Sequence, residues 1–284
     1  MILRPYQEQM VSKAVAALKK HGDTLAVAPT GAGKTVLLSA LAGRVGGKQL
    51  ILQHRDELTF QNAKKYREVN PRVRVGMFNA DIKDWKGDAT FAMVQTLCRD
   101  RALSTIPKLD LLVIDEAHHA VAPSYRKVVD AVRDKNPDCR IFGVTATPAR
   151  GDGKGLRHIF SNCCDQLSLH SLIAMGFLVR PRTFVCTLEG TDDRLASLRK
   201  TASGEFDMNE AEAVLDMEVH NAAVVREWKK LASDRKTIVF ASTVRHAEHA
   251  AEAFRAEGVN AAVVSGKTSS FERAALLRRF DEGD

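Results

Sequence analysis

Short apolar runs alternate with amphipathic stretches in the first half of the chain, and this alternation constrains the fold more than any other feature. Within the predicted strand Leu109–Ile114, the run after Asp110 is continuously apolar up to Asp115, which is typical of a strand buried on both faces of a parallel sheet. The same reasoning predicts further strands at Thr24–Ala28, Gln49–Gln53, Val73–Phe78, Thr90–Met93 and Arg140–Val144. Helices are expected at residues 6–20, Thr35–Val45, Asp56–Tyr66 and Ser124–Val132. We therefore expect an α/β fold, with a doubly wound parallel sheet over residues 1–150.

The second half of the chain is less regular. Residues 151–215 are predicted to form a linker or bridging region, with a glycine-rich loop near Gly151, a strand near Thr183–Leu188 and the polar stretch Glu189–Asn209. Residues 216–284 return to alternation and predict a partial second α/β domain. Its expected helices are Val219–Leu231, Val244–Glu257 and Ser270–Phe280, and its expected strands are Thr237–Phe240 and Ala261–Val264.

Composition sets the broad class. The 284 residues are 45% hydrophobic and 27% charged, which suits an ordinary globular protein of two domains. An excess of 42 Lys and Arg over 35 Asp and Glu fits a polyanionic partner, although many enzymes are mildly basic. No apolar run approaches the roughly 20 residues of a membrane span, and no signal peptide is recognisable. Five cysteines without C-x-x-C spacing indicate a reduced, cytoplasmic protein without structural zinc.

A glycine-rich loop joins the first predicted strand to the next helix. Glycines at this junction let backbone N–H groups and the helix dipole hold a polyphosphate. Lys34 is positioned to reach the β- and γ-phosphates, and the Thr35 hydroxyl to bind Mg²⁺. The alternative is a glycine turn with a chance lysine, which the flanking strand and helix disfavour. The predicted site for ATP and Mg²⁺ comprises Pro29, Thr30, Gly31, Ala32, Gly33, Lys34 and Thr35.

A second polar group, Asp115-Glu116-Ala117-His118, directly follows the buried strand Leu109–Ile114. Strand ends are where doubly wound sheets hold their ligands. Asp115 is therefore predicted to bind Mg²⁺, and Glu116 to orient or deprotonate a water. The alternative is a solvated acidic turn, which is disfavoured so close to a phosphate loop.

The order of these segments, followed by Thr145-Ala146-Thr147, resembles motifs I, II and III of superfamily 2 DEAD/DEAH-box helicases and translocases. This resemblance implies RecA-like domains, with His118, Thr145 and Thr147 coupling the nucleotide site to the rest of the motor. Leu3-Arg4-Pro5-Tyr6-Gln7 is similar to the Q-motif, which implies that Arg4 and Gln7 contact adenine and select ATP. Without the family, a lone glutamine at a helix start is more often a surface residue.

Further segments resemble the family's nucleic-acid contacts. Leu52–Arg55 looks like motif Ia and Ala92–Leu97 like motif Ib. The resemblance implies that His54, Arg55, Gln95 and Thr96 contact the backbone of DNA or RNA, with DNA preferred by analogy. From its sequence alone, Arg55 could equally be a surface cation, and His119 is predicted to be an ordinary loop histidine. For Phe78 and Trp85, hydrophobic packing is favoured over stacking on bases.

The chain resembles bacterial and phage helicases of the RadD-like and restriction-subunit kinds, with linker matches at Ser171–Leu178 and Phe206–Glu210. Ile238–Thr243 resembles motif IV, which opens the second, here incomplete, RecA-like domain. No Gln-x-x-Gly-Arg-x-x-Arg pattern like motif VI occurs, so this chain alone is expected to bind ATP but hydrolyse it slowly. Two alternatives stay open: a truncated module that only binds nucleotide or nucleic acid, and a P-loop ATPase that does not act on nucleic acid. The oligomeric state is also open.

Overall fold

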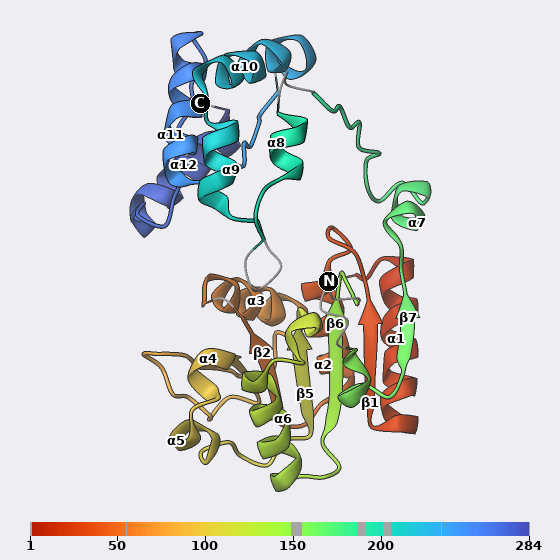
Figure 1. The fold of residues 1–284 in the computed structure, drawn as a ribbon. Coiled ribbons are helices and arrows are strands. Elements are labelled where there is room, and N and C mark those ends of the chain that lie inside the picture. The colour runs from red at the N-terminus through yellow and green to blue at the C-terminus, as the bar shows by residue number, and fades with distance from the viewer. Residues whose placement is uncertain are drawn as a thin grey trace. The chain divides into compact units, whose positions relative to one another are not determined.

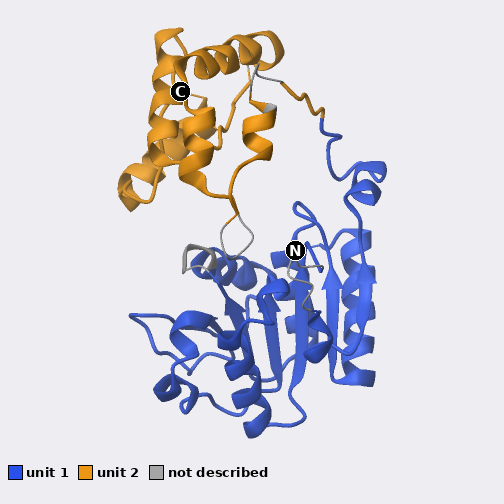
Figure 2. Cartoon of the chain, viewed as in Figure 1, with its two compact units in different colours: residues 1–181 blue, residues 182–284 orange. Residues whose placement is uncertain are grey.

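The computed structural model describes residues 2–54, 56–148, 155–186, 191–200, 206–233 and 235–283. It divides the chain into two compact units, Met1–Pro181 and Arg182–Asp284, coloured separately in Figure 2. Within the described residues, no helix combines the length and the apolar character needed to cross a membrane.

The first unit is built on a seven-stranded parallel sheet in the order β3-β4-β2-β5-β6-β1-β7 (Figure 1). Its strands are β1 (Asp23–Val27), β2 (Gln49–Gln53), β3 (Val75–Phe78), β4 (Ala89–Met93), β5 (Leu111–Asp115), β6 (Arg140–Thr145) and β7 (Cys163–Gln166). Strands β1 and β2, and likewise β2 and β3, are adjacent in sequence but separated in the sheet, whereas β3 pairs with β4 and β5 pairs with β6. Because all these pairs are parallel, each connection has to cross from one end of the sheet to the other. The predicted α/β, doubly wound fold is confirmed.

Helices cover both faces of this sheet. Successive side chains of β5 point to opposite faces, so Val113 joins one core while Leu112 and Ile114 join the other. The first core contains side chains of α1, α2 and α3, and the second contains side chains of α4 and α6. Phe78 is buried with its ring centroid 4.9 Å from that of Trp85, so the packing role predicted for this pair is confirmed. The helices of this unit are α1 (Pro5–His21), α2 (Lys34–Val45), α3 (Asp56–Val69), α4 (Val94–Leu97), α5 (Asp100–Leu103), α6 (Pro123–Lys135) and α7 (Leu169–Ala174), with the 3-10 helices η1 (Ala117–His119) and η2 (Leu156–His158).

The first unit continues past the expected boundary at residue 150. Strand β7 pairs with β1 at the edge of the sheet, and Leu172 of α7 is buried in the first core. The sequence did not predict β7, because Cys163–Gln166 is short, polar and incompletely buried, as edge strands often are. Residues 155–181 therefore belong to the first unit and not to a separate bridging region.

The second unit is helical in its described residues. Its helices are α8 (Asp192–Ala196), α9 (Met208–Leu215), α10 (Glu218–Ala232), α11 (Val244–Ala256) and α12 (Ser270–Glu282). Helices α10 and α11 pack together, and the rings of Trp228 and Phe254 meet edge to face at 5.3 Å. Side chains of Asp207, Thr243 and Ser269 accept hydrogen bonds from first-turn N–H groups and so fix the starts of α9, α11 and α12.

The strands predicted in this unit are wrong for the described residues. Segments 183–186, 237–240 and 261–264 form no strand there, and residues 187 and 188 lie outside the described residues. A strand needs a hydrogen-bonded neighbour, and local apolar pattern cannot supply one. Most apolar side chains in these segments are exposed, with Val185 at 88% and Phe240 at 93%.

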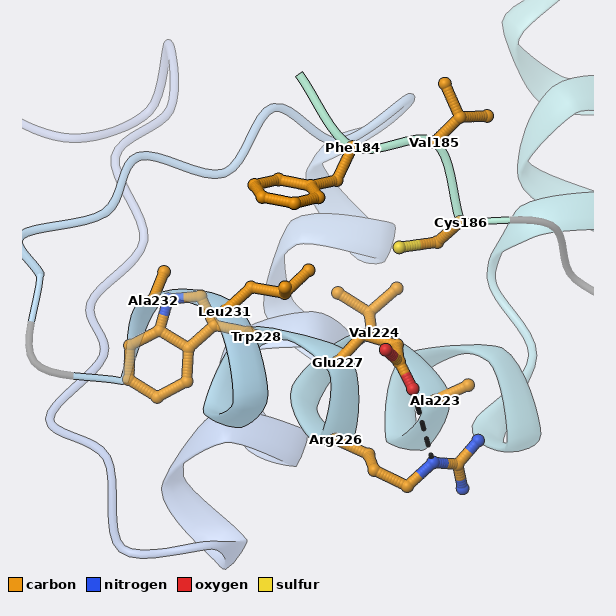
Figure 3. Close-up of a pocket in the computed structure, with 10 residues that line it drawn as sticks. All are labelled: Phe184, Val185, Cys186, Ala223, Val224, Arg226, Glu227, Trp228, Leu231 and Ala232. Atoms are coloured by element: carbon orange, nitrogen blue, oxygen red, sulfur yellow. Dashed lines mark ion pairs between the residues drawn. The ribbon is translucent and has the colours of Figure 1, made fainter. Parts of the chain in front are cut away.

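A cavity of about 570 Å³ lies in the second unit, between residues 184–186 and helix α10. Figure 3 shows Phe184 and Cys186 turned toward α10 and Val185 turned away, the alternation of an extended backbone. Its walls are mostly apolar, with the Arg226–Glu227 ion pair (3.9 Å) beside them. None of the nucleotide-site residues predicted from sequence lines this cavity.

Candidate nucleotide site

The glycine-rich loop leaves β1 and enters α2 as predicted. Gly31 and Gly33 have φ of +84° and +75°, backbone angles that residues with a Cβ rarely adopt. A Cβ on Gly31 would lie 2.8 Å from Leu178 Cδ2, and one on Gly33 would lie 2.7 Å from Gln7 Nε2. Gly33 is the N-cap residue directly before α2, whose first-turn N–H groups have no acceptor within the helix. The loop therefore combines tight turns with a helix N-terminus, the arrangement that suits a phosphate.

Helix α1 supports this loop from one side. Tyr6 Oη and Gln7 Nε2 both donate to the Ala32 carbonyl, at 3.0 and 3.1 Å, while Gln7 Oε1 accepts from the Arg4 backbone N–H at 3.0 Å. Gln7 is only 5% exposed, so it is not the surface residue that a lone glutamine would suggest. Both ends of its amide are engaged by the protein, and its contact with adenine stays a prediction.

Asp115 lies at the end of β5, and its carboxylate is joined to Thr35 through a single side chain. Asn62 of α3 accepts from Thr35 Oγ1 at 2.9 Å and donates to Asp115 Oδ2 at 3.2 Å. It also donates to Gln53 Oε1 at 2.9 Å. Burial raises the pKa of the Asp115 carboxyl, and the adjacent charge of Glu116 raises it further. The two predicted magnesium ligands are thus brought to one buried amide.

Glu116 follows in a strained turn. Among the described residues it is the one non-glycine residue with positive φ, at +48°. This conformation costs energy and is often found where a side chain must be aimed at a ligand. The Glu116 carboxylate contacts Lys34 Nζ at 3.3 Å and His118 Nδ1 at 3.4 Å. Lys34 and Glu116, predicted from separate motifs, therefore meet across the site.

His118 connects this turn to the next strand. Its Nδ1 lies 2.9 Å from Thr145 Oγ1 at the end of β6. Thr145 Oγ1 in turn accepts from the Thr147 backbone N–H at 3.2 Å. These three residues, predicted to couple the site to the rest of the molecule, form one connected group, and their coupling role stays a prediction.

Of the predicted nucleic-acid contacts, the structure brings His54 and Gln95 together. Gln95 Nε2 donates to the His54 carbonyl at 3.0 Å and lies 3.3 Å from His54 Nδ1. Both residues are exposed, and Thr96 lies half-buried on α4. Arg55 lies outside the described residues.

Sequence reasoning missed Asn62, Gln53 and the arrangement of His119. Asn62 had a signal, because Thr59, Asn62, Ala63 and Tyr66 share one face of α3 at helical spacing and all are buried. A polar residue on an apolar face needs a partner, and here it has three. His119 had no comparable local signal.

Comparison with known proteins agrees with this geometry. The family model described as type III restriction enzyme, res subunit matches residues 1–150. The putative mitochondrial ATP-dependent helicase irc3 of Schizosaccharomyces pombe is 31% identical over 98% of this chain and 47% of its own length. The putative ATP-dependent helicase IRC3 of Saccharomyces cerevisiae is 26% identical over 100% of this chain and 43% of its own length. The chain thus spans about half the length of these curated relatives.

Among solved structures, the ATP-dependent type ISP restriction-modification enzyme LlaBIII bound to DNA aligns with a TM-score of 0.66. The alignment covers 100% of this chain and 24% of that one at 12% identity, so it supports the fold alone. The family match and the fold agree on one conclusion: the chain belongs to the restriction-enzyme res-subunit family of superfamily 2 helicases.

Proposed function

We propose that this chain is the nucleotide-binding part of an ATP-dependent DNA helicase or translocase. The observation that carries the proposal is the meeting of the glycine-rich loop and the β5 turn. Lys34 lies 3.3 Å from Glu116, and Asn62 joins Thr35 to Asp115. A lysine, a hydroxyl and two carboxylates with this spacing suit hydrolysis of a nucleoside triphosphate.

The donor set fits Mg²⁺. Thr35 and Asp115 offer a hydroxyl and a carboxylate oxygen, the hard ligands that this cation prefers, and both contact Asn62. Bound Mg²⁺ neutralises phosphate charge and polarises the terminal phosphoryl group. Burial holds the pKa of Asp115 above its usual range, so a cation at this carboxylate is favoured by the charge it would balance.

The chain's own residues would act in sequence. Lys34 exchanges its contact with Glu116 for the β- and γ-phosphates of ATP. Glu116 is then released to accept a proton from the attacking water. His118 contacts both Glu116 and Thr145. A shift of the Glu116 carboxylate would therefore move the His118 ring and change its contact with Thr145 at the end of β6. Arg4 and Gln7 would contact the adenine.

The preference for DNA rests on similarity. LlaBIII is bound to DNA, and the yeast relatives are named as helicases. His54 and Gln95 lie exposed at strand ends near the nucleotide site and would contact phosphates together with Arg55 and Thr96. We also propose that the second unit corresponds to part of a second RecA-like domain, supported by the motif IV-like segment Ile238–Thr243.

ATP turnover by the chain, measured with single-stranded DNA, duplex DNA, RNA or no nucleic acid, tests the proposal. We expect slow, Mg²⁺-dependent turnover that DNA increases and that Lys34→Ala abolishes. Lys127→Ala is the matched control, because Lys127 is an exposed lysine of α6 whose ion pair is with the exposed Asp100. Turnover indifferent to every nucleic acid would instead support a P-loop ATPase of another kind, and greater stimulation by RNA would reverse the choice of substrate.

A further inference from the structure

Three aromatic rings from separate segments lie nearly parallel beside the nucleotide site. The His54 ring, after β2, stacks on the His119 ring of η1, with centroids 4.5 Å apart and planes inclined by 17°. His119 in turn lies over Tyr125 of α6, at 6.5 Å and 18°. Tyr125 is 1% exposed and fixed in the second core, so the stack has a rigid base. His119 is therefore held between a buried ring and an exposed one.

One end of this stack is tied to the nucleotide site. The His119 backbone N–H donates to the Glu116 carbonyl at 2.9 Å. The His119 ring also contacts the ring of His118, whose Nδ1 faces Glu116 and Thr145. Because Glu116 carries the contact with Lys34, a change in this turn when nucleotide binds would shift His119 through its own backbone.

The other end belongs to the exposed strand-end loops. Gln95 Nε2 binds the His54 carbonyl at 3.0 Å and lies 3.3 Å from its ring nitrogen. The His54 ring is therefore oriented by Gln95 and by His119. Both His54 and Gln95 are among the residues that the proposed function assigns to the nucleic-acid backbone.

We propose that His119 is a positioning residue that couples nucleotide binding to nucleic-acid binding through its stacking contact with His54. The proposal rests on the proposed function, since it needs both ligands. It assigns a role to a residue that the sequence alone suggested was an ordinary loop histidine. The structure shows His54 stacked on His119, and the proposal requires that His54 leave this contact in one of the two ligand states.

The size of the effect is limited by the contact itself. A stacked ring pair can carry a coupling of at most roughly tenfold in affinity. The measured quantity is the ratio of DNA dissociation constants without and with a nonhydrolysable ATP analogue and Mg²⁺. Fluorescence anisotropy of a labelled single strand, titrated with the full 284-residue chain, gives this ratio.

Five proteins test the proposal: the wild type, His119→Ala, His119→Phe, His54→Ala and the double variant His54→Ala/His119→Ala. We expect His119→Ala to bring the ratio close to one, His119→Phe to retain it because a planar ring remains, and the double variant to lose no more than His119→Ala. The affinity for the ATP analogue alone and the unfolding midpoint are measured for each protein. If His119→Ala does not fold, the ratios of His119→Phe and His54→Ala are compared instead. The proposal then requires that His119→Phe keep the wild-type ratio and that His54→Ala bring it close to one.

The outcomes separate the two claims. A wild-type chain that binds no DNA refutes the proposed function, and this inference with it. A wild-type ratio that persists in His119→Ala overturns only the coupling role of His119. A His119→Phe variant that loses the ratio as fully as His119→Ala also overturns it, since stacking is the contact invoked.

Discussion

Replacing Asn62 by alanine removes a buried amide that touches both predicted magnesium ligands. Asn62 makes hydrogen bonds to Thr35, Gln53 and Asp115, and its side chain is buried. Two of these bonds are between neutral groups and contribute about 1 kcal/mol each, while the bond to a carboxylate contributes about 1.5–3 kcal/mol. We therefore expect Asn62→Ala to lower the free energy of unfolding of the first unit by about 3.5–5 kcal/mol.

A control variant on the same segment isolates the role of the site. Asn70, directly after α3, donates one hydrogen bond to the Ser39 carbonyl at 2.8 Å and lies away from Thr35 and Asp115. Asn70→Ala should therefore cost about 1 kcal/mol of unfolding free energy. Urea denaturation followed by circular dichroism measures both losses, and thermal unfolding with Mg²⁺ and an ATP analogue measures ligand stabilisation.

The unfolding free energy and the stabilisation by ligand together test whether Asn62 bridges Thr35 and Asp115. Asn62→Ala should lose stability and should also gain less stabilisation from Mg²⁺ and the analogue, because Thr35 and Asp115 are no longer held together. Asn70→Ala should keep the full ligand-induced stabilisation. An Asn62→Ala chain as stable as Asn70→Ala, or one that responds to ligand as the wild type does, would refute the bridging role.

Two further predictions concern a buried charge and an exposed ring. Burial raises the pKa of Asp115, so its contribution to stability is present at low pH and is lost as pH rises through the raised pKa. Asp115→Asn should therefore stabilise the metal-free chain increasingly as pH rises from the ordinary carboxyl pKa through the raised one, as denaturant midpoints measure, while losing stabilisation by Mg²⁺ and ATP. A metal-free wild type more stable than this variant at pH 7 would contradict the argument. Phe240 is 93% exposed, so Phe240→Ser should change the unfolding free energy by less than about 0.5 kcal/mol, whereas Phe254→Ser on α11, at 6% exposure, should cost about 3–5 kcal/mol. A large loss in Phe240→Ser would mean that residues 237–240 are paired in solution.

The order of apolar and polar residues predicted the first unit well, because each of its strand ends and helix starts is marked by residues close together in the sequence. The apolar run before Asp115 and the glycine loop before Lys34 each specify a strand end and a helix start within a few residues. Parallel strands place such ends at one edge of a sheet, so the meeting of Lys34 and Glu116 follows from topology. Edge strand β7 escaped prediction because four residues of Cys163–Gln166 carry too little pattern.

Local sequence pattern predicted the helices of the second unit but not the absence of strands among its described residues. Residues 237–240 and 261–264 have the composition of strands, yet in the described part of the chain they form none. Strand formation depends on a neighbouring strand that can come from any part of the sequence. The helices Glu218–Ala232 and Val244–Ala256 instead make their backbone hydrogen bonds within themselves, and their bounds were predicted to within one residue.

The sequence by itself determined the α/β class, strands β1 to β6 in their order with helices α1, α2, α3 and α6, and the glycine-rich loop and Asp115–Glu116 of the candidate nucleotide site, whereas the short helices α4 and α5 were not predicted. Only the tertiary structure decided that Asn62 joins Thr35 to Asp115, that Gln7 is buried against the loop, and that His119 stacks on His54. The physical reason is distance along the chain: periodicity reports how one element faces the core, but contacts between side chains far apart in sequence exist only after the elements have packed.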